Sequence, residues 1–344
     1  MRILPLLVLA AASLLAADHF PFKVAQPAEV IAELEMQSPD SDWAEEGREA
    51  AMAVLTLDRR SEQHVMLFAG DRRFTYRVFL GRLEPGTHEL SVARSEEHSA
   101  PQAKLAVHSV EFRSLSRADP DYEIIANAPV LFARQNTIRK FTDIPLLAYC
   151  ERLQENGKVL LQYTVIFSNE DGGTSTRALM ARWGRTTDIE YLYKVYLDSK
   201  GNAVSATVQG RDHQELEFAG KREGAHPLLI PVTDNNMVSG EAASSVRYQL
   251  VPVLVDMAAH SREQVMDDNP ITYQVMTKEL IREDKLRPFA VEAGEKTSDP
   301  RNYAFFEYKA ENTNAALAIT VRLKTGKESY SSFLGRLDYA IARN

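Results

Sequence analysis

The stretch AMAVLTLDRRSEQHVMLFAGDRRFTYRVFLG, residues 51–81, is the clearest indication of the fold class, because its apolar residues recur at every second position. This spacing puts apolar side chains on one face of a strand, whereas a helix needs a spacing of three or four residues. Turn-forming residues separate the runs. The alternating runs are 51–58, 64–70, 74–81, 83–94 and 104–115. Short strands at this density predict a small antiparallel β-sandwich.

The chain beyond this region also alternates, in longer runs. RADPDY, residues 117–122, indicates a linker, because the residue before a proline is disfavoured in helical conformation. The predicted strands beyond it are 158–168, 189–198, 203–210, 246–255, 303–310, 316–325 and 332–341. We therefore predict an all-β protein of two antiparallel β-sandwich domains, residues 18–118 and 119–344.

Two segments have helical spacing instead. TYQVMTKELIRED, about residues 272–284, follows an Asn-Pro pair typical of a helix start and predicts the main helix of the chain. EVIAELEMQ, residues 29–37, also has apolar residues at helical spacing, and we expect a short helix there.

Residues 1–17 have the composition of a secretory signal peptide: Arg2, an uncharged apolar stretch, and small residues ending at Ala17. The stretch is shorter than the ~20 apolar residues that span a membrane, so we expect cleavage rather than anchoring. No later segment approaches that length of apolar sequence. The expectation is an exported protein, periplasmic or extracellular, with no transmembrane anchor after cleavage.

The composition of the chain argues against several classes of partner and of active site. The 344 residues include 48 acidic and 40 basic ones, a net charge of −8, which argues against a nucleic-acid partner. The single cysteine, Cys150, excludes an intramolecular disulfide and a Cys-x-x-Cys metal site. It lies in an apolar run and is expected in the core rather than as a nucleophile. The chain also lacks the GxSxG, HExxH and phosphate-loop motifs.

An acidic loop, residues 168–174, joins two predicted strands. Its Gly-Gly pair is typical of a hairpin turn, which is one interpretation. The other is a calcium site, because Glu170 and Asp171 offer the oxygen ligands that Ca²⁺ prefers. Asp188 and Glu190 are further candidate ligands for such a metal ion.

Asp188 and Glu190 are two residues apart, so in a strand both carboxylates project from one face. Two such carboxylates repel each other unless they share a cation, a proton or an arginine. Arg182 and Arg185 are near enough in sequence to neutralise them without any ligand. Trp183 between these arginines is either an aromatic wall for a sugar ring or a core residue.

Two histidines extend the candidate site. His213 follows Asp212 at a predicted strand end, and His226 lies in a Gly-Ala-His-Pro turn. Folding could join them to the carboxylates as a metal cluster or as a base with its orienting acid. The alternative is that they are ordinary solvated or hydrogen-bonded loop residues. The candidate catalytic residues are Asp188, Glu190, Asp212, His213 and His226, and the candidate ligand-binding residues are Trp183, Arg185, Asp234 and Asn235.

Three stretches carry a resemblance to a group of uncharacterised secreted bacterial proteins and, more distantly, to the vacuolar-protein-sorting-associated family of plants and fungi. They are 128–131 (APVL), 183–190 and 224–227 (GAHP). The second resembles that family's Gly-Asp-Trp-Glu region, although the Trp precedes the Asp here. The resemblance implies a β-rich domain and transfers no catalytic role.

The run LGRLEPGTHELSVAR, residues 80–94, followed by VHSVEF, resembles the closing strands of galactose-binding-like modules. In those modules the LxxGxHxLxV pattern is a structural hairpin. The resemblance therefore implies a fold and not a ligand.

Three functions remain open from the sequence. The first is a secreted or periplasmic binding protein that presents loops to a glycan or an envelope component. The second is an extracytoplasmic hydrolase with a carboxylate/His site, and the third is a structural envelope protein. β-Sandwiches host all three, so the arrangement of the site has to decide.

Overall fold

The computed structural model describes residues 17–155, 157–170, 175–288 and 296–306, together with residues 308, 310–311, 315–322, 324–325, 329–331 and 336. The predicted signal peptide, apart from Ala17, lies outside the described residues and stays a prediction. The predicted strand 332–341 also lies outside them, except for residue 336.

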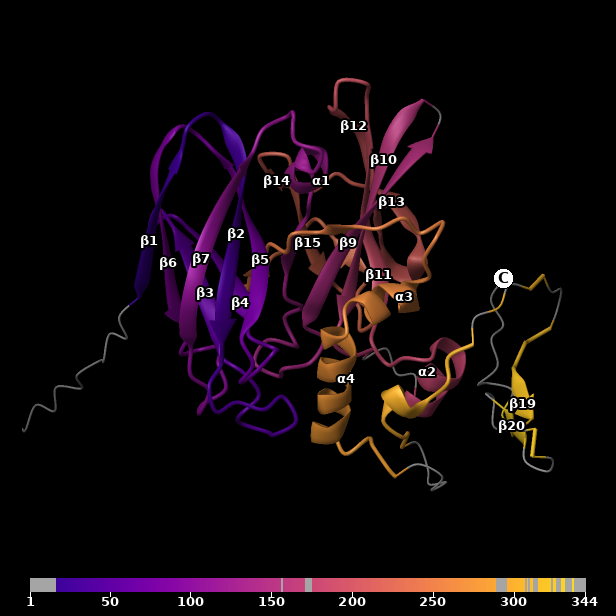
Figure 1. Cartoon of the computed structure of the whole chain (residues 1–344). Coiled ribbons are helices and arrows are strands. Elements are labelled where there is room, and N and C mark those ends of the chain that lie inside the picture. Colours follow the sequence, from indigo (N-terminus) through magenta and orange to yellow (C-terminus); the bar gives the residue numbers. More distant parts are fainter. Residues whose placement is uncertain are drawn as a thin grey trace, which may run out of the picture.

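Seven strands of the N-terminal part form two sheets around one core (Figure 1). One sheet has the order β1-β6-β3-β4 and the other β5-β2-β7, and all pairs are antiparallel. Their bounds are β1 Asp18–Val24, β2 Ala28–Gln37, β3 Met52–Leu57, β4 Ser61–Met66, β5 Phe74–Leu83, β6 Gly86–Arg94 and β7 Ala106–Leu115. Apolar side chains such as Leu34 and Leu55 are fully buried in this core. The five alternating runs are thus strands, as predicted.

Residues 29–37, for which we expected a helix, belong to strand β2. The expectation was wrong because Ala, Glu, Leu and Met favour helices locally, although the pattern also repeats every two residues. Leu34 and Met36 are buried, while Glu33 and Glu35 are only partly buried. β2 is hydrogen-bonded to β5 on one side and β7 on the other, so sheet pairing overrides the local preference.

The C-terminal part contains a six-stranded sheet, β13-β12-β11-β10-β9-β18, and a smaller one, β14-β15-β8-β17, with β16 beside β15. The longer strands are β9 Pro145–Glu155, β10 Lys158–Phe167, β11 Ile189–Leu197, β12 Ala203–Gln209 and β15 His226–Pro231. The shorter ones are β8 Val130–Phe132, β13 Glu215–Glu217, β14 Arg222–Glu223, β16 Val238–Ser239, β17 Arg247–Tyr248 and β18 Val253–Leu254. Most pairs are antiparallel, but β8–β15 and β9–β18 are parallel.

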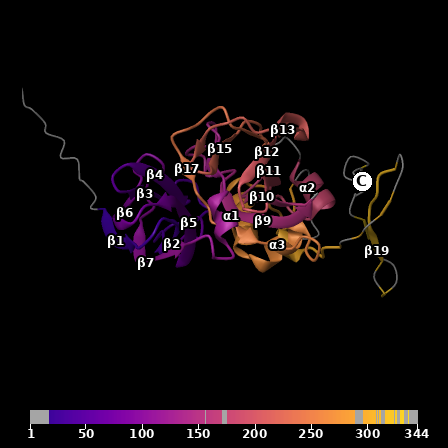
Figure 2. The same ribbon diagram turned by 90° about the horizontal axis from the view of Figure 1, so that it is seen from above.

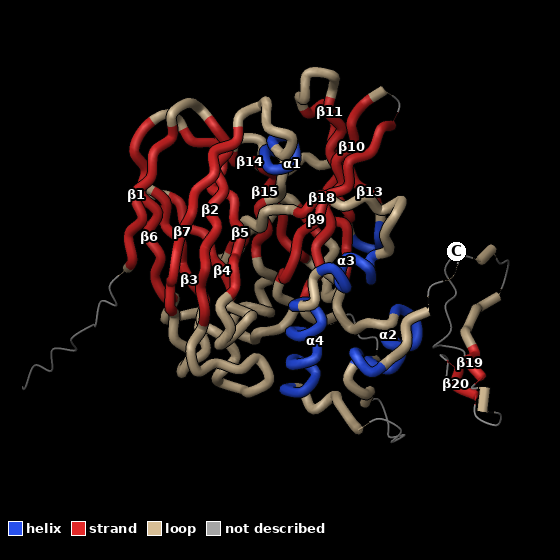
Figure 3. Tube along the Cα trace, in the orientation of Figure 1, coloured by secondary structure: helices blue, strands red, loops and turns tan. Residues whose placement is uncertain are grey.

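The all-β prediction with minor helix is confirmed, and the predicted helix is α4, Ile271–Arg282 (Figure 3). Three shorter helices, α1 Tyr122–Ala126, α2 Thr176–Trp183 and α3 Arg262–Asp268, were not predicted. Of the predicted strand 303–310, the described residues form none. The described residues of the run 316–325 include strand β19, Thr320–Arg322, which pairs with β20, Ser329–Ser331.

The predicted hairpin at 168–174 was wrong, because a helix separates the two flanking strands. The Ser175 hydroxyl accepts the Ala178 N–H and begins α2, and Gly184 ends it at φ 69°. Strand β11 starts only after α2, at Ile189. Within the described residues, no helix is long and apolar enough to cross a membrane.

The two parts of the chain meet along the outer edge of β5 (Figure 2). The Phe79 N–H donates to the Gln249 carbonyl at 3.0 Å, and the Val251 N–H donates to the Arg77 carbonyl at 3.2 Å. Val78 and Leu80 on either side of Phe79 belong to the first core, so strand alternation directs Phe79 into the second. In return, Phe141 packs into the first core. The predicted boundary near 116–122 separates the sheets, while the cores on either side of it interlock.

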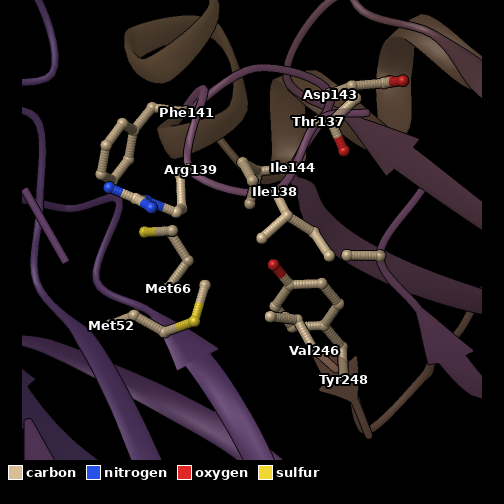
Figure 4. Close-up of a pocket in the computed structure, with 11 residues that line it drawn as sticks. Met52, Met66, Thr137, Ile138, Arg139, Phe141, Asp143, Ile144, Val246 and Tyr248 are labelled. Atoms are coloured by element: carbon tan, nitrogen blue, oxygen red, sulfur yellow. The ribbon is translucent and has the colours of Figure 1, made fainter. Parts of the chain in front are cut away.

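A narrow pocket marks this junction (Figure 4). Met52 and Met66 line it from the N-terminal part, and Ile138, Phe141 and Tyr248 line it from the C-terminal part. Its walls are mainly apolar, and none of the site residues predicted from the sequence lies among them. We therefore treat it as loose packing between the two parts.

The junction predicts the effect of Phe79→Ala. Phe79 is completely buried, and its removal should lower the free energy of unfolding by about 3–5 kcal/mol, since a cavity opens where both cores meet. Urea denaturation followed by circular dichroism measures this. Leu153→Ala is the control: this side chain is 45% exposed, and its loss should cost less than about 0.5 kcal/mol. Equal effects of the two variants would contradict the described junction.

Candidate functional site

The inner half of the candidate site is a buried row of polar side chains at the start of β11. Asp188 is 3% exposed and accepts a hydrogen bond from Asn236 Nδ2 at 2.9 Å. The same nitrogen donates to Asp143 Oδ1 at 2.6 Å, and Asp143 Oδ2 accepts from Arg134 at 2.6 Å. Arg134 also pairs with Asp234 at the surface. Three elements distant in sequence are tied together by this row.

The outer half of the site surrounds Glu190, the second residue of β11. Gln209 Nε2, at the end of β12, donates to Glu190 Oε2 at 2.7 Å and lies 2.8 Å from His213 Nδ1. The distance between His213 Nδ1 and Glu190 Oε2 is 4.0 Å. Asn235 Nδ2 lies 3.5 Å from the other ring nitrogen, Nε2, of His213. The imidazole is thus bracketed by the strand ends and by the 233–237 loop.

Backbone conformation helps to position these groups. Asp212 and His213 both have φ 58°, a left-handed conformation that bends the β12–β13 turn and carries the imidazole back over β11. Asn236 has φ 55° and is 1% exposed. Asparagine, aspartate and histidine are found in this conformation more often than other residues except glycine.

Burial dominates the electrostatics of the two carboxyls. It raises the pKa of Asp188, against the opposing effects of the Asn236 hydrogen bond and of the Arg185 and Arg262 charges. Burial, followed by the charge of Asp188, raises the pKa of Glu190 to about 7. The Glu190 carboxyl therefore readily holds a proton near neutral pH. Arg185 takes part in the neutralisation, as one of our two interpretations predicted.

Five predicted residues meet in this region: Asp188, Glu190, His213, Asp234 and Asn235. Arg185 lies nearby but is engaged inward, since it donates to Glu263 Oε1 at 3.0 Å and to the Thr187 carbonyl. Asp212 is exposed in the turn before His213. Trp183 is the half-buried last residue of α2.

His226 does not join this group. It is 3% exposed at the junction of the two parts, where Nε2 lies 3.3 Å from Glu29 Oε2 and Nδ1 lies 2.9 Å from the Ala128 carbonyl. Its ring stacks on Phe79 with centroids 4.5 Å apart. His226 therefore has a structural role, as the alternative interpretation of the histidines held.

The calcium prediction stays a prediction. Asp171 lies outside the described residues. The Glu170 backbone N–H donates to the Thr186 carbonyl at 3.0 Å. In the described part of the chain, no three His, Cys, Asp or Glu side chains are grouped so that they could hold a metal ion. Amide hydrogen bonds and arginine charges accompany Asp188 and Glu190 instead. Cys150 is fully buried and burial raises the pKa of its thiol, as expected for a core residue.

Sequence reasoning missed the residues that hold the site together: Arg134, Asp143, Gln209 and Asn236. Asn236 follows the predicted pair 234–235 directly, and a polar turn of this kind was a usable signal. Arg134 and Asp143 come from the loop between β8 and β9, about a hundred residues before the 233–237 loop. No spacing rule connects them to that loop or to β11.

Comparisons with known proteins leave the family open. No family model matches the chain, and no curated protein matches it. NLPPya in complex with mannosamine is similar at 12% identity and TM-score 0.30, covering 46% of this chain and 80% of that one. NLPPya in complex with glucosamine has the same identity and TM-score and covers 56% and 93%. A ruminal GH26 endo-β-1,4-mannanase, at 10% identity and TM-score 0.21, covers 33% and 20%. These TM-scores carry no argument about this chain.

Asn236→Ala tests whether the buried row is a structural unit. The change leaves two buried carboxyls without their shared donor, which should cost about 1–3 kcal/mol of unfolding free energy. Chemical denaturation at a pH near neutral measures it. Asn235→Ala is the matched control, because this adjacent amide is only partly buried and should cost much less. The described row would be wrong if both variants had the stability of the unaltered protein.

Proposed function

We propose that the protein is an exported binding protein that recognises a glycan through the outer half of the site. Glu190, His213, Asp234 and Asn235 offer the ligand groups, and the buried Gln209 holds Glu190 and His213 in place. The observation that carries this proposal is the junction of a carboxyl, an imidazole and a carboxamide at the protein surface. Sugar hydroxyls donate and accept hydrogen bonds at once, and these three side-chain types together offer both functions.

The contrast between the two halves of the site supports binding. Asp188 and Asn236 are sealed and fixed by several hydrogen bonds, whereas the side chains of His213 and Asp234 are 39% and 64% exposed. A rigid interior below exposed polar groups reduces the conformational entropy lost when a ligand binds.

A second candidate function, hydrolysis, is favoured by one specific observation. The pKa of Glu190 is raised to about 7 by burial, and an acid with a pKa near ambient pH is suited to general acid–base catalysis. His213 lies 4.0 Å away and would accept or return the proton. A structural envelope role, without a soluble ligand, is the third alternative.

The binding proposal predicts retention on a polysaccharide or oligosaccharide. The protein lacking residues 1–17 would be screened on a glycan array, and each glycan that binds would be measured by calorimetry. His213→Ala and Asn235→Ala should each weaken binding about tenfold, which corresponds to about 1.4 kcal/mol for one lost polar contact.

His108→Ala is the matched control, because His108 is an exposed histidine on β7 whose Nε2 contacts Gln37. It should bind like the unaltered protein. Absence of binding to every glycan would overturn the glycan proposal, and assembly into large oligomers in size-exclusion chromatography would then favour the structural alternative. Elemental analysis of the same preparation tests the calcium prediction.

The hydrolase alternative predicts turnover that depends on the Glu190 carboxyl. Chromogenic glycosides and esters would be tested across pH, and Glu190→Gln should lower kcat by about 10²–10⁴-fold, since the proton donor is lost. Glu215→Gln, on the exposed edge strand β13, is the control. Turnover unaffected by Glu190→Gln would exclude this site as its source.

A further inference from the structure

Another buried carboxyl, which is not one of the proposed ligand groups, lies where α4 packs against the N-terminal sandwich. Glu279 of α4 is completely buried. The Trp43 indole Nε1–H donates to Glu279 Oε2 at 3.1 Å, and the Thr142 hydroxyl lies 2.7 Å from Oε1. Trp43 comes from the loop between β2 and β3, and Thr142 from the loop between β8 and β9. One carboxyl thus joins three separate parts of the chain.

The charges around this carboxyl leave it only partly compensated. The Arg282 guanidinium is 4.0 Å from Glu279 but donates instead to the Trp43 carbonyl at 3.0 Å and the Phe141 carbonyl at 2.6 Å. Glu283 on the same helix adds a like charge. At the rim, Lys278 pairs with Asp42 of the N-terminal sandwich at 2.9 Å.

Burial therefore governs the ionisation of Glu279. It raises the pKa of this carboxyl to about 7, and the charge of Glu283 acts in the same direction. The Arg282 charge and hydrogen bonds from Thr142 and Ser168 oppose the rise. The Thr142 hydroxyl and the Trp43 indole donate to the two carboxyl oxygens, and neither of these donors carries a charge.

We propose that Glu279 is a pH-sensitive latch: its protonated carboxyl holds α4 against the N-terminal sandwich, and its ionisation loosens that contact. The pKa of the docked group is raised, so the stabilisation is complete below the pKa of an exposed glutamate, about 4.5. It is lost progressively as pH rises towards and through about 7. Between these two values the docked-to-loosened ratio falls by up to about tenfold per pH unit, and above 7 it levels off.

The latch also reaches the proposed ligand site. Thr142 immediately precedes Asp143, which belongs to the buried row below Glu190. Loosening of the 133–144 loop would disturb that row, a consequence that rests on the proposed function. The docking itself does not depend on a ligand and is tested without one.

The test uses Trp43 as a reporter, because the chain has only two tryptophans. In the full protein carrying Trp183→Phe, acrylamide quenching of Trp43 emission would be recorded from about pH 5.5 to about pH 9. We expect quenching to rise several-fold between about pH 5.5 and about pH 7 and to change little above about pH 7. Adding Glu279→Gln should abolish this rise, since glutamine keeps the shape and stays neutral.

Glu283→Gln is the matched control, because this neighbouring carboxyl is not completely buried and should leave the transition in place. Hydrogen exchange of residues 271–282 in the unaltered protein, corrected for the intrinsic pH dependence, gives an independent readout if Glu279→Gln fails to fold. A transition that persists in Glu279→Gln would overturn the latch. So would the absence of any change in quenching or exchange across this pH range.

Discussion

The structure depends on one residue being clamped at the edge of a sheet. The Phe79 N–H donates to the Gln249 carbonyl, and the Phe79 carbonyl accepts from the side-chain amides of Gln249 and Gln63 at 2.8 and 3.1 Å. An unpaired backbone at this buried edge would be costly, so the C-terminal part has to supply its partner. The same pairing places the aromatic ring of Phe79 in the second core, where it stacks on His226.

The candidate site is separate from the pairing at Phe79, but its buried polar groups also need hydrogen-bond partners from distant parts of the chain. Asp188 and Asp143 are buried carboxyls, and each needs donors from a different element. Asn236 supplies both with one nitrogen, which fixes the 233–237 loop against β11. Asn235 is next to Asn236 in this loop, and its Nδ2 lies 3.5 Å from His213 Nε2, so the loop also holds the imidazole in place. The buried polar groups, whose hydrogen bonds are satisfied, therefore fix the positions of the side chains above them at the surface.

The sequence indicated many of the strands but not their partners, and it gave no prediction for β1 or β9. Alternation identified β3 to β7 and β10 to β12, because a half-buried strand repeats every two residues. It failed at β2, where helix-forming residue types hide the same alternation. It could not show that β8 pairs with β15 in parallel, since nothing local encodes a contact between segments so far apart.

For the site, spacing alone placed Asp188 and Glu190 together, and folding added His213 and Asn235 from the list of candidates. His226 was separated from them because its neighbour Phe79 belongs to the other part of the chain. Arg134 and Asp143 had no sequence signal, as their role depends on a loop whose path is set by tertiary contacts.

The interlocked cores have a consequence for how this protein could have evolved. A module that exchanges freely between proteins needs a surface that is complete without its neighbour. The N-terminal sandwich lacks one, because Ile31, Phe79 and Leu115 complete their burial in the second core. Recombination near residue 118 would therefore produce a fragment with an adhesive apolar edge. The two parts of the chain are expected to have been inherited as a pair, with substitutions on one side of the junction compensated on the other.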